Sequence, residues 1–114
     1  MKVISDAYSV WYDSSTEIIF CQGSLRLSGM TEYQPIVELL DTVLEQTPQK
    51  IVLDFRELEF LNSSGINVFS KFVIRVRQQK NTAMKVLGSK SVPWQGKSLK
   101  NLKRLMPSLE LDWI

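Results

Sequence analysis

The feature that most constrains this chain is a change of hydrophobic period within residues 51–77. The stretch opens with a short apolar run, Ile51–Phe55, shortly after Pro48. A run this short that contains β-branched and aromatic residues is typical of a strand covered on both faces. A loop follows, and apolar residues then recur at the spacing of an α-helix. The sequence therefore predicts a strand, a loop and an amphipathic helix in direct succession.

The predicted helix has one apolar side and one largely polar side. The apolar side consists of Ile66, Phe69, Phe72, Val73 and Val76. The opposite side consists of Asn67, Lys71, Ile74, Arg75 and Gln78. Because the first side suits a protein core, the second is left for another contact. The preceding loop, Asn62-Ser63-Ser64-Gly65, contains residue types that cap a helix N-terminus, and Ser63 is expected at the positive end of the helix dipole.

Similar alternations place this helix within a larger α/β fold. Thr31 and Gln34 fit a capping box, so another helix is expected to begin at about Thr31 and to end at Thr47–Pro48. The other expected elements are strands at Tyr8–Tyr12, Thr16–Cys21, Ala83–Leu87 and Leu109–Ile114 and a helix at Pro93–Met106. The alternation of strands and helices after the first strand pair favours parallel right-handed crossovers. We therefore expect one α/β domain, residues 1–114, with a mixed sheet of about five strands and three helices largely on one face (β-β-α-β-α-β-α-β).

Composition argues against several kinds of site. The chain has no histidine, which is the commonest general base and transition-metal ligand, so a zinc centre or a Ser-His-Asp triad is not expected. Cys21 is the only cysteine, so no disulfide is expected within the chain. The sequence also lacks an apolar run of about 18 residues and a leader-like N-terminus. We expect a cytoplasmic protein without metal, cofactor or membrane insertion.

The charges are distributed unevenly along the chain. Residues 1–59 contain four basic and ten acidic side chains, whereas residues 60–114 contain ten basic and two acidic ones. This asymmetry suggests a basic surface that attracts an acidic partner, a phosphate or nucleic acid. The alternative is a set of solvated helix faces. No nucleic-acid-binding motif accompanies the charge, so specific binding of nucleic acid is not expected.

The segment Ser91–Ser98 has some features of a phosphate-binding P-loop. It lies between a predicted strand and a predicted helix, and it ends in Gly96-Lys97-Ser98. However, Ser91 stands where the motif needs its first glycine, Pro93 lacks a backbone N–H, and Trp94 crowds the loop. Nucleotide hydrolysis is therefore not expected.

The stretch Ile51–Phe69 resembles the signature of STAS domains, a family named for sulfate transporters and anti-sigma-factor antagonists. The family shows an apolar strand that ends in Asp, an apolar pair, the sequence Asp-Ser-Ser/Thr-Gly and an apolar helix. This chain matches with Asp54, the pair Phe60-Leu61 and Ser63-Ser64-Gly65, and it has Asn62 in place of the motif Asp. The resemblance indicates a small stand-alone bacterial member of the family.

The resemblance implies that the protein binds a protein partner and has no enzymatic activity of its own. In the antagonists of the family, the serine directly after the motif Asp is phosphorylated by a partner that is both a kinase and an anti-sigma factor. Carried over, Ser63 is the phosphoacceptor, with Ser64 as the second choice, and the partner is an anti-sigma factor or a switch kinase in transcription regulation. The implied contact surface consists of Asn62, Ser64, Gly65, Asn67, Lys71, Ile74, Arg75 and Gln78.

Two alternatives to this phosphorylation switch stay open. Asn62 and Ser63 are good capping residues, so helix capping alone explains both. The other alternative is a STAS-like module that senses a small or lipidic ligand without phosphorylation. A homo-oligomer is also compatible with the sequence.

Overall fold

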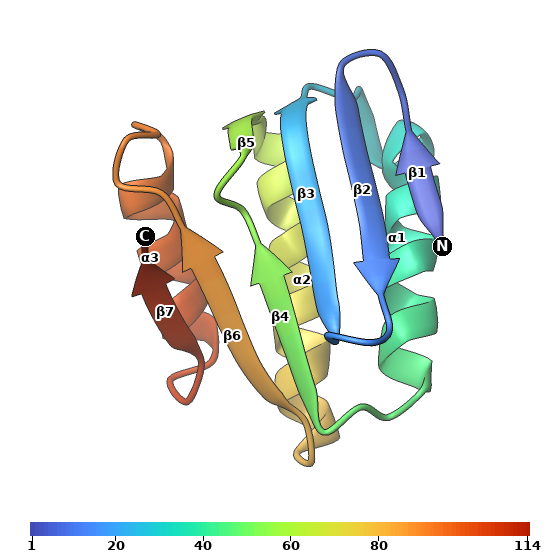
Figure 1. Ribbon diagram of the computed structural model, residues 1–114, viewed down its shortest axis with the longest axis vertical. Helices are drawn as coiled ribbons and strands as arrows, with labels where there is room; N and C mark the ends of the chain where they lie inside the picture. Colours follow the sequence, from blue (N-terminus) through green and yellow to red (C-terminus); the bar gives the residue numbers. More distant parts are fainter.

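The computed structural model describes residues 1–114, which form seven strands and three helices (Figure 1). The strands are β1 (Lys2–Ile4), β2 (Tyr8–Asp13), β3 (Ile18–Leu25), β4 (Lys50–Asp54), β5 (Leu58–Leu61), β6 (Ala83–Gly88) and β7 (Glu110–Trp113). The helices are α1 (Gly29–Glu45), α2 (Ser63–Gln79) and α3 (Gln95–Leu105). This arrangement confirms the predicted α/β class and the number of helices.

The sheet is mixed, with the order β1-β2-β3-β4-β6-β7 and with β5 beside β3. The first three strands pair in antiparallel fashion. The pairs β3–β4, β4–β6 and β6–β7 are all parallel. The predicted antiparallel pair and the predicted parallel connections are therefore both confirmed.

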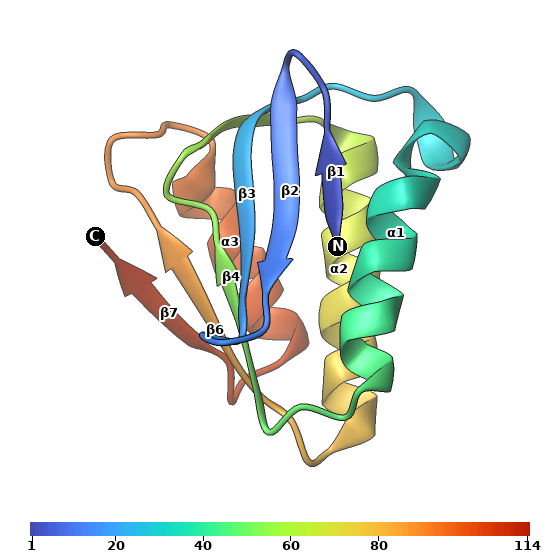
Figure 2. The same cartoon turned by 45° about the vertical axis from the view of Figure 1, so that its right-hand side comes forward.

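All three helices lie on the same face of the sheet (Figures 1 and 2). Between the two layers, side chains such as Ile51, Leu53, Phe69 and Phe72 are fully buried. Burial of each such side chain stabilises the fold by about 1.5–3 kcal/mol. This packing determines which side of α2 faces the core and leaves the opposite side exposed.

The sheet contains two short strands beyond the five that were expected. β1 has three residues, which is too short for a hydrophobic alternation to be recognised in the sequence. β5 pairs with β3 because β3 is eight residues long and extends past the end of β4. β4 pairs with Ile18–Phe20, and β5 pairs with Gly23–Leu25. The loop before α2 is thereby attached to the sheet through β5.

A glycine permits this change of strand partner on β3. The register between β3 and β5 shifts between Gly23 and Ser24. Gly23 has a φ of 87°, a conformation that other residues rarely adopt. A Cβ atom there would also overlap the carbonyl oxygen of Ala7. The bulge therefore requires glycine at this position.

Helix α1 begins earlier than the sequence indicated. Its N-cap is Ser28, and the Glu32 carboxylate accepts a hydrogen bond from the Ser28 N–H at 2.7 Å. The prediction of a capping box at Thr31 is wrong, because Glu32 supplies the acceptor for a start three residues upstream. Pro35 consequently lies inside the helix.

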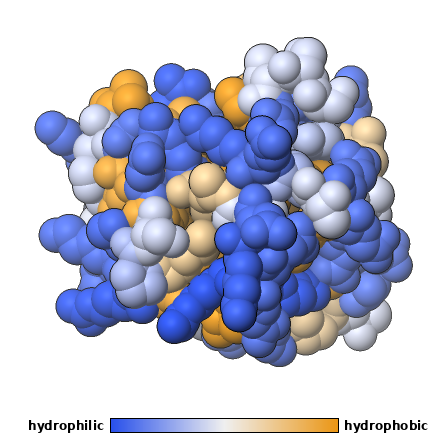
Figure 3. All heavy atoms as spheres, turned by 90° about the horizontal axis from the view of Figure 1, so that it is seen from below, coloured by the Kyte–Doolittle hydropathy of each residue, from blue (hydrophilic) through white to orange (hydrophobic).

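The loop before α2 and the amino ends of β4 and β6 lie at opposite ends of the molecule (Figure 1). The end formed by the amino ends of β4 and β6 is mostly hydrophilic, with only scattered hydrophobic residues (Figure 3). The loop before α2 lies at the other end, beside β5 (Figure 1). The candidate site lies at this second end, which the carboxyl ends of the parallel strands form.

None of the helices combines the length and the apolar character needed to cross a bilayer.

Candidate functional site

The chain reaches the site through a turn that Asp54 organises at the end of β4. The Asp54 side chain is 6% exposed, and its Oδ2 lies 2.7 Å from Nη2 of Arg56. Its Oδ1 accepts from the Arg56 backbone N–H at 3.1 Å and from Nε at 3.0 Å. Hydrogen bonding and attraction to Asp54 raise the pKa of Arg56. The strand aspartate of the motif therefore has a structural role, which is to direct the chain from β4 into β5.

The side chain of Asn62 fixes the loop before α2. Asn62 is the N-cap of the helix, and its Oδ1 accepts a hydrogen bond from the Gly65 N–H at 2.9 Å. Oδ1 also accepts from the Tyr33 hydroxyl at 2.7 Å, and Nδ2 donates to the Leu27 carbonyl at 2.8 Å. The amide thus joins the start of α2 to the start of α1. An ionised aspartate could not bond to Leu27, because it has no donor.

Tyr33 and Gly65 complete this network. Tyr33 is fully buried, and burial raises the pKa of its hydroxyl, which stays a donor at neutral pH. A Cβ atom at Gly65 would overlap the Leu61 side chain and would lie 2.6 Å from the Tyr33 hydroxyl oxygen. The motif glycine is therefore needed for close packing of the loop against α1 and β5.

Ser63 is the first residue of α2 and is exposed, whereas Ser64 is half-buried. The side chain that caps the helix is Asn62, so the reading in which Ser63 shares this task is not supported. The first turn contains no acidic residue, so no carboxylate of this turn neutralises the positive end of the helix dipole. The Ser63 hydroxyl is accessible and is not needed as a cap. Its phosphorylation stays a prediction.

The outer side of α2 continues from this loop, and we call the two together the α2 surface. It consists of residues 62–65 with Asn67, Lys71, Ile74, Arg75 and Gln78. Arg75 is half-buried, and its Nη2 lies 2.6 Å from Oδ1 of Asp41 in α1. The helix residues Asn67, Lys71, Ile74 and Gln78 are exposed. Asp41 neutralises Arg75, so Lys71 is the cation of this surface that lies outside an ion pair.

Two exposed apolar residues near the loop were not predicted as part of the contact surface. Phe60 is 36% exposed, and the guanidinium carbon of Arg26 lies 4.3 Å from the centre of its ring. Met30, in the first turn of α1, is 44% exposed. The bond from Asn62 to Leu27 holds these segments next to the start of α2. The only sequence feature that indicated apolar residues here was the pair Phe60-Leu61 before Asn62.

The P-loop-like segment serves a structural purpose at the start of α3. Gln95 is fully buried, and its Oε1 accepts from the Ser89 N–H at 2.7 Å. Its Nε2 donates to the carbonyls of Phe55 and Leu58 at 2.7 and 3.0 Å. The Trp94 indole also donates to the Leu58 carbonyl, at 3.2 Å. These side chains tie the start of α3 to the connection between β4 and β5.

Comparison with known proteins gives a family match for the centre of the chain. A family model described as the STAS domain matches residues 30–92, which include Asp54, the loop at residues 62–65 and all of α2. No curated protein sequence matches the chain.

Solved structures similar to the whole chain come from Pseudomonas aeruginosa. A chain in the crystal structure of the diguanylate cyclase SiaD with its activator SiaC has a TM-score of 0.76 and 9% identity, and the match covers 100% of this chain and 99% of that one. SiaC has a TM-score of 0.74 and 12% identity, with 98% and 94% covered. Apo-SiaC has a TM-score of 0.71 and 10% identity, with 99% and 98% covered. At these identities the likeness concerns the fold.

Proposed function

The chain belongs to the STAS domain family, whose model covers more than half of it, and from this premise we propose that it is a regulatory module that binds a protein partner through the α2 surface. The module has no catalytic activity of its own, and phosphorylation of Ser63 controls its binding. The observation that carries the proposal is the exposed position of Ser63 at the start of a helix that Asn62 caps.

A phosphate on Ser63 is electrostatically compatible with the domain. It adds about −1.5 to −2 charges at neutral pH. The N-terminus of a helix favours such charge, and the first turn of α2 has no acidic residue that would oppose it. Because Asn62 is neutral, the phosphate does not face the carboxylate that the family motif has at this position. The domain can therefore carry the phosphate without a change of fold.

The same phosphate opposes the docking of an acidic partner. The unmodified α2 surface offers Lys71 as a cation and Ile74, which is 38% exposed, as an apolar contact. Apolar anchors contribute most of the affinity at an interface, and complementary charge adds orientation and association rate. A phosphate beside these groups repels acidic side chains and loses water on docking. We expect phosphorylation to weaken binding by roughly 10- to 100-fold.

Two classes of partner fit this proposal. The family resemblance points to an anti-sigma factor that is also a kinase, which would place the protein in transcription regulation in the bacterial cytoplasm. The second class is an enzyme that is activated when this chain binds to it. It is favoured by the likeness over the whole chain to SiaC, the activator of the diguanylate cyclase SiaD.

Phosphate transfer tests the proposal directly. The protein is incubated with ATP and a switch kinase of the anti-sigma-factor class, and the phosphate is located by mass spectrometry. We expect one phosphate on Ser63 that is lost in Ser63→Ala. Ser64→Ala is the matched control, because it removes the adjacent hydroxyl, and it should keep the phosphate. Undiminished phosphorylation of Ser63→Ala would remove Ser63 from the switch.

Partner binding then tests whether phosphorylation of Ser63 acts as a switch. The phosphorylated protein should bind the partner more weakly than the unmodified protein, and Lys71→Ala should weaken binding most at low salt. Lys80→Ala, at the opposite end of α2, is the control for a lost cation. Affinity that does not change with salt concentration would argue against Lys71 as a steering charge.

A further inference from the structure

A row of cations follows the outward side of α3. Lys97, Lys100, Asn101 and Arg104 are exposed and recur at the spacing of one helix face. We call Lys97, Lys100 and Arg104 the α3 stripe. At 1.5 Å per residue, the stripe is about 10 Å long. It shares no residue with the α2 surface, and no residue of α3 is acidic.

The cations of the α3 stripe lack a carboxylate partner. They take part in none of the ion pairs of the structure. The only acidic residues of the C-terminal half, Glu110 and Asp112, lie on β7, and their carboxylates are 3.8 and 2.9 Å from Nζ of Lys85. Arg104 has one long contact, 3.4 Å from its Nη1 to Oδ1 of Asn101. The stripe therefore presents a positive charge that attracts acidic groups from outside the chain.

These charges are unfavourable for the helix that carries them. Lys97 lies in the first turn, where the helix dipole favours acidic side chains, and this turn has none. Lys100 lies three residues after Lys97 and four before Arg104, and like charges at these spacings repel each other. By contrast, Nζ of Lys103 donates to the Leu109 carbonyl at 2.6 Å and stabilises the end of the helix. Charges that disfavour their own helix without a local bond are typical of a functional surface.

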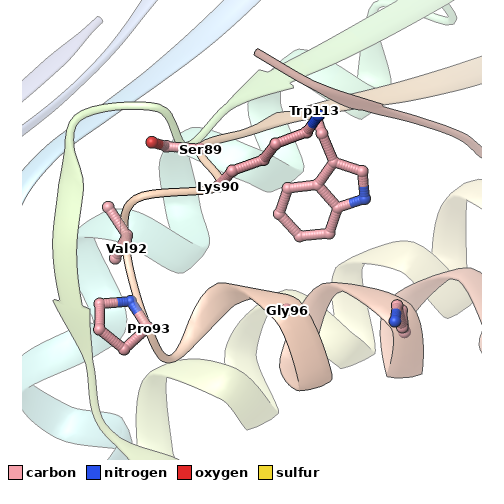
Figure 4. Close-up of a pocket in the computed structure, with 7 residues that line it drawn as sticks. Ser89, Lys90, Val92, Pro93, Gly96 and Trp113 are labelled. Atoms are coloured by element: carbon pink, nitrogen blue, oxygen red, sulfur yellow. The ribbon is translucent and has the colours of Figure 1, made fainter.

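A hollow beside the stripe offers an apolar contact. It lies between the carboxyl end of β6, the start of α3 and β7, and its volume is about 330 Å³ (Figure 4). Lys100 and Gly96 line it from α3, and the half-buried Trp113 lines it from β7, with its ring projecting toward α3. A Cβ atom at Gly96 would meet no atom within 4 Å, so there is open space on the α3 side. A recessed indole can accept an apolar side chain of a partner, which is the kind of anchor that dominates affinity at interfaces.

We propose that the α3 stripe binds an acidic helix of a protein partner, with carboxylates along the stripe and one apolar side chain in the hollow. Carboxylates three or four residues apart on such a helix match the stripe, because both helices have the same rise. An anionic membrane fits less well, since membrane-surface helices insert large apolar side chains and α3 exposes none. Nucleic acid fits less well, because the indole is recessed and no nucleic-acid-binding motif accompanies the charge.

Peptide binding to the full chain tests this proposal. The probe is an alanine-based helical peptide of about 20 residues with glutamate at every third or fourth position and one leucine. The control peptide has glutamine in place of each glutamate. Nuclear magnetic resonance follows the titration at low salt. The glutamate peptide should shift the Gly96 and Asn101 amides and the Trp113 indole, and it should bind about tenfold more tightly than the glutamine peptide.

Substitutions in the stripe locate the binding groups. Lys97→Ala, Lys100→Ala and Arg104→Ala should each weaken binding of the glutamate peptide about threefold, since exposed ion pairs are screened. Lys2→Ala is the control, because it removes an exposed cation of β1 at the opposite edge of the sheet (Figure 1). Lys97→Glu should weaken binding about tenfold and should raise the urea concentration at the midpoint of unfolding, because the new charge suits the first turn and attracts Lys100. Weaker binding by a more stable variant cannot result from loss of the fold.

Three kinds of result would overturn the proposal. Equal affinity for the glutamate and glutamine peptides would remove the charge of the stripe from recognition. Equal effects of Lys2→Ala and Lys100→Ala, or shifts confined to the amides of α2, would remove α3 as the binding helix. Tighter binding to phosphatidylglycerol vesicles or to polyuridylate at the same salt concentration would replace the acidic helix by a membrane or by nucleic acid. Because the stripe and the α2 surface share no residue, this test and phosphate transfer to Ser63 fail independently of each other.

Discussion

The starts of α2 and α3 lie at the same end of the sheet, but they are held by different means. In α2, the cap is Asn62, and the first helical residue, Ser63, is exposed. In α3, the N-cap residue Trp94 makes no capping bond with its side chain, and the first helical residue, Gln95, is the buried anchor. The same position is thus exposed in one helix and a buried anchor in the other. Only the α2 arrangement leaves the side chain of the first helical residue accessible from outside.

The largest effect that distinguishes the two helix starts is expected for Gln95→Ala. The substitution leaves the Ser89 N–H and the Phe55 carbonyl without their hydrogen bonds in a buried place. Because an unsatisfied buried polar group costs about 1–3 kcal/mol, we expect a loss of about 3 kcal/mol in the free energy of unfolding. Urea unfolding measures this, with the exposed Gln78→Ala as the matched control. A loss below about 1 kcal/mol would mean that water replaces the amide and that Gln95 is not an anchor.

A smaller loss is expected when the α2 cap is removed by Asn62→Ala. The variant loses the cap on Gly65 and the bonds to Tyr33 and Leu27, so we expect about 2 kcal/mol in the free energy of unfolding. A double-mutant cycle with Tyr33→Phe isolates the bond between Asn62 and Tyr33. The two substitutions should couple by about 0.5–1 kcal/mol. Strict additivity would show that the bond between Asn62 and Tyr33 contributes nothing to stability.

The sequence predicted those parts of the fold that depend on local pattern. The helical spacing of Phe69, Phe72 and Val76 identified the buried side of α2, and the short apolar runs identified β4 and β6. β1 was missed because three residues carry no period. The start of α1 was misplaced because two residue sets could cap it, and only the folded chain shows that Glu32 reaches the Ser28 N–H.

The parts of the site that depend on long-range contacts could not be predicted. The partners Asn62 and Tyr33 are 29 residues apart, and Gln95 and Phe55 are 40 residues apart. No periodicity links such pairs, since their meeting depends on how α1 and α3 pack beside α2. The same applies to Arg75, whose charge was counted as available but is paired with Asp41 of α1.

Asn62→Asp, which restores the motif residue of the family, should lower the free energy of unfolding by about 1 kcal/mol. A carboxylate can still accept from the Gly65 N–H and the Tyr33 hydroxyl, and its charge at the helix N-terminus is favourable by about 0.3–1 kcal/mol. It loses the bond to Leu27, because a carboxylate oxygen takes the place of the Asn62 nitrogen that now lies 2.8 Å from the Leu27 carbonyl oxygen. Two acceptor oxygens then face each other without a hydrogen between them. Thermal or urea unfolding at neutral pH measures the balance. A variant more stable than the natural chain would mean that the loop rearranges and that the bond to Leu27 contributes little.

The smallest effect is expected for Ser63→Ala, at the position in α2 that corresponds to Gln95 in α3. The hydroxyl is exposed and does not cap the helix, and alanine is a good helix former, so the free energy of unfolding should change by less than about 0.5 kcal/mol. Ser63→Glu should be slightly more stable than Ser63→Ala, by about 0.3–1 kcal/mol at low salt, because the charge lies at the helix N-terminus. Urea unfolding of both variants checks this order. A loss above about 1 kcal/mol in Ser63→Ala would show that the hydroxyl is structural, and then a phosphate at this place would disturb the fold that has to carry it.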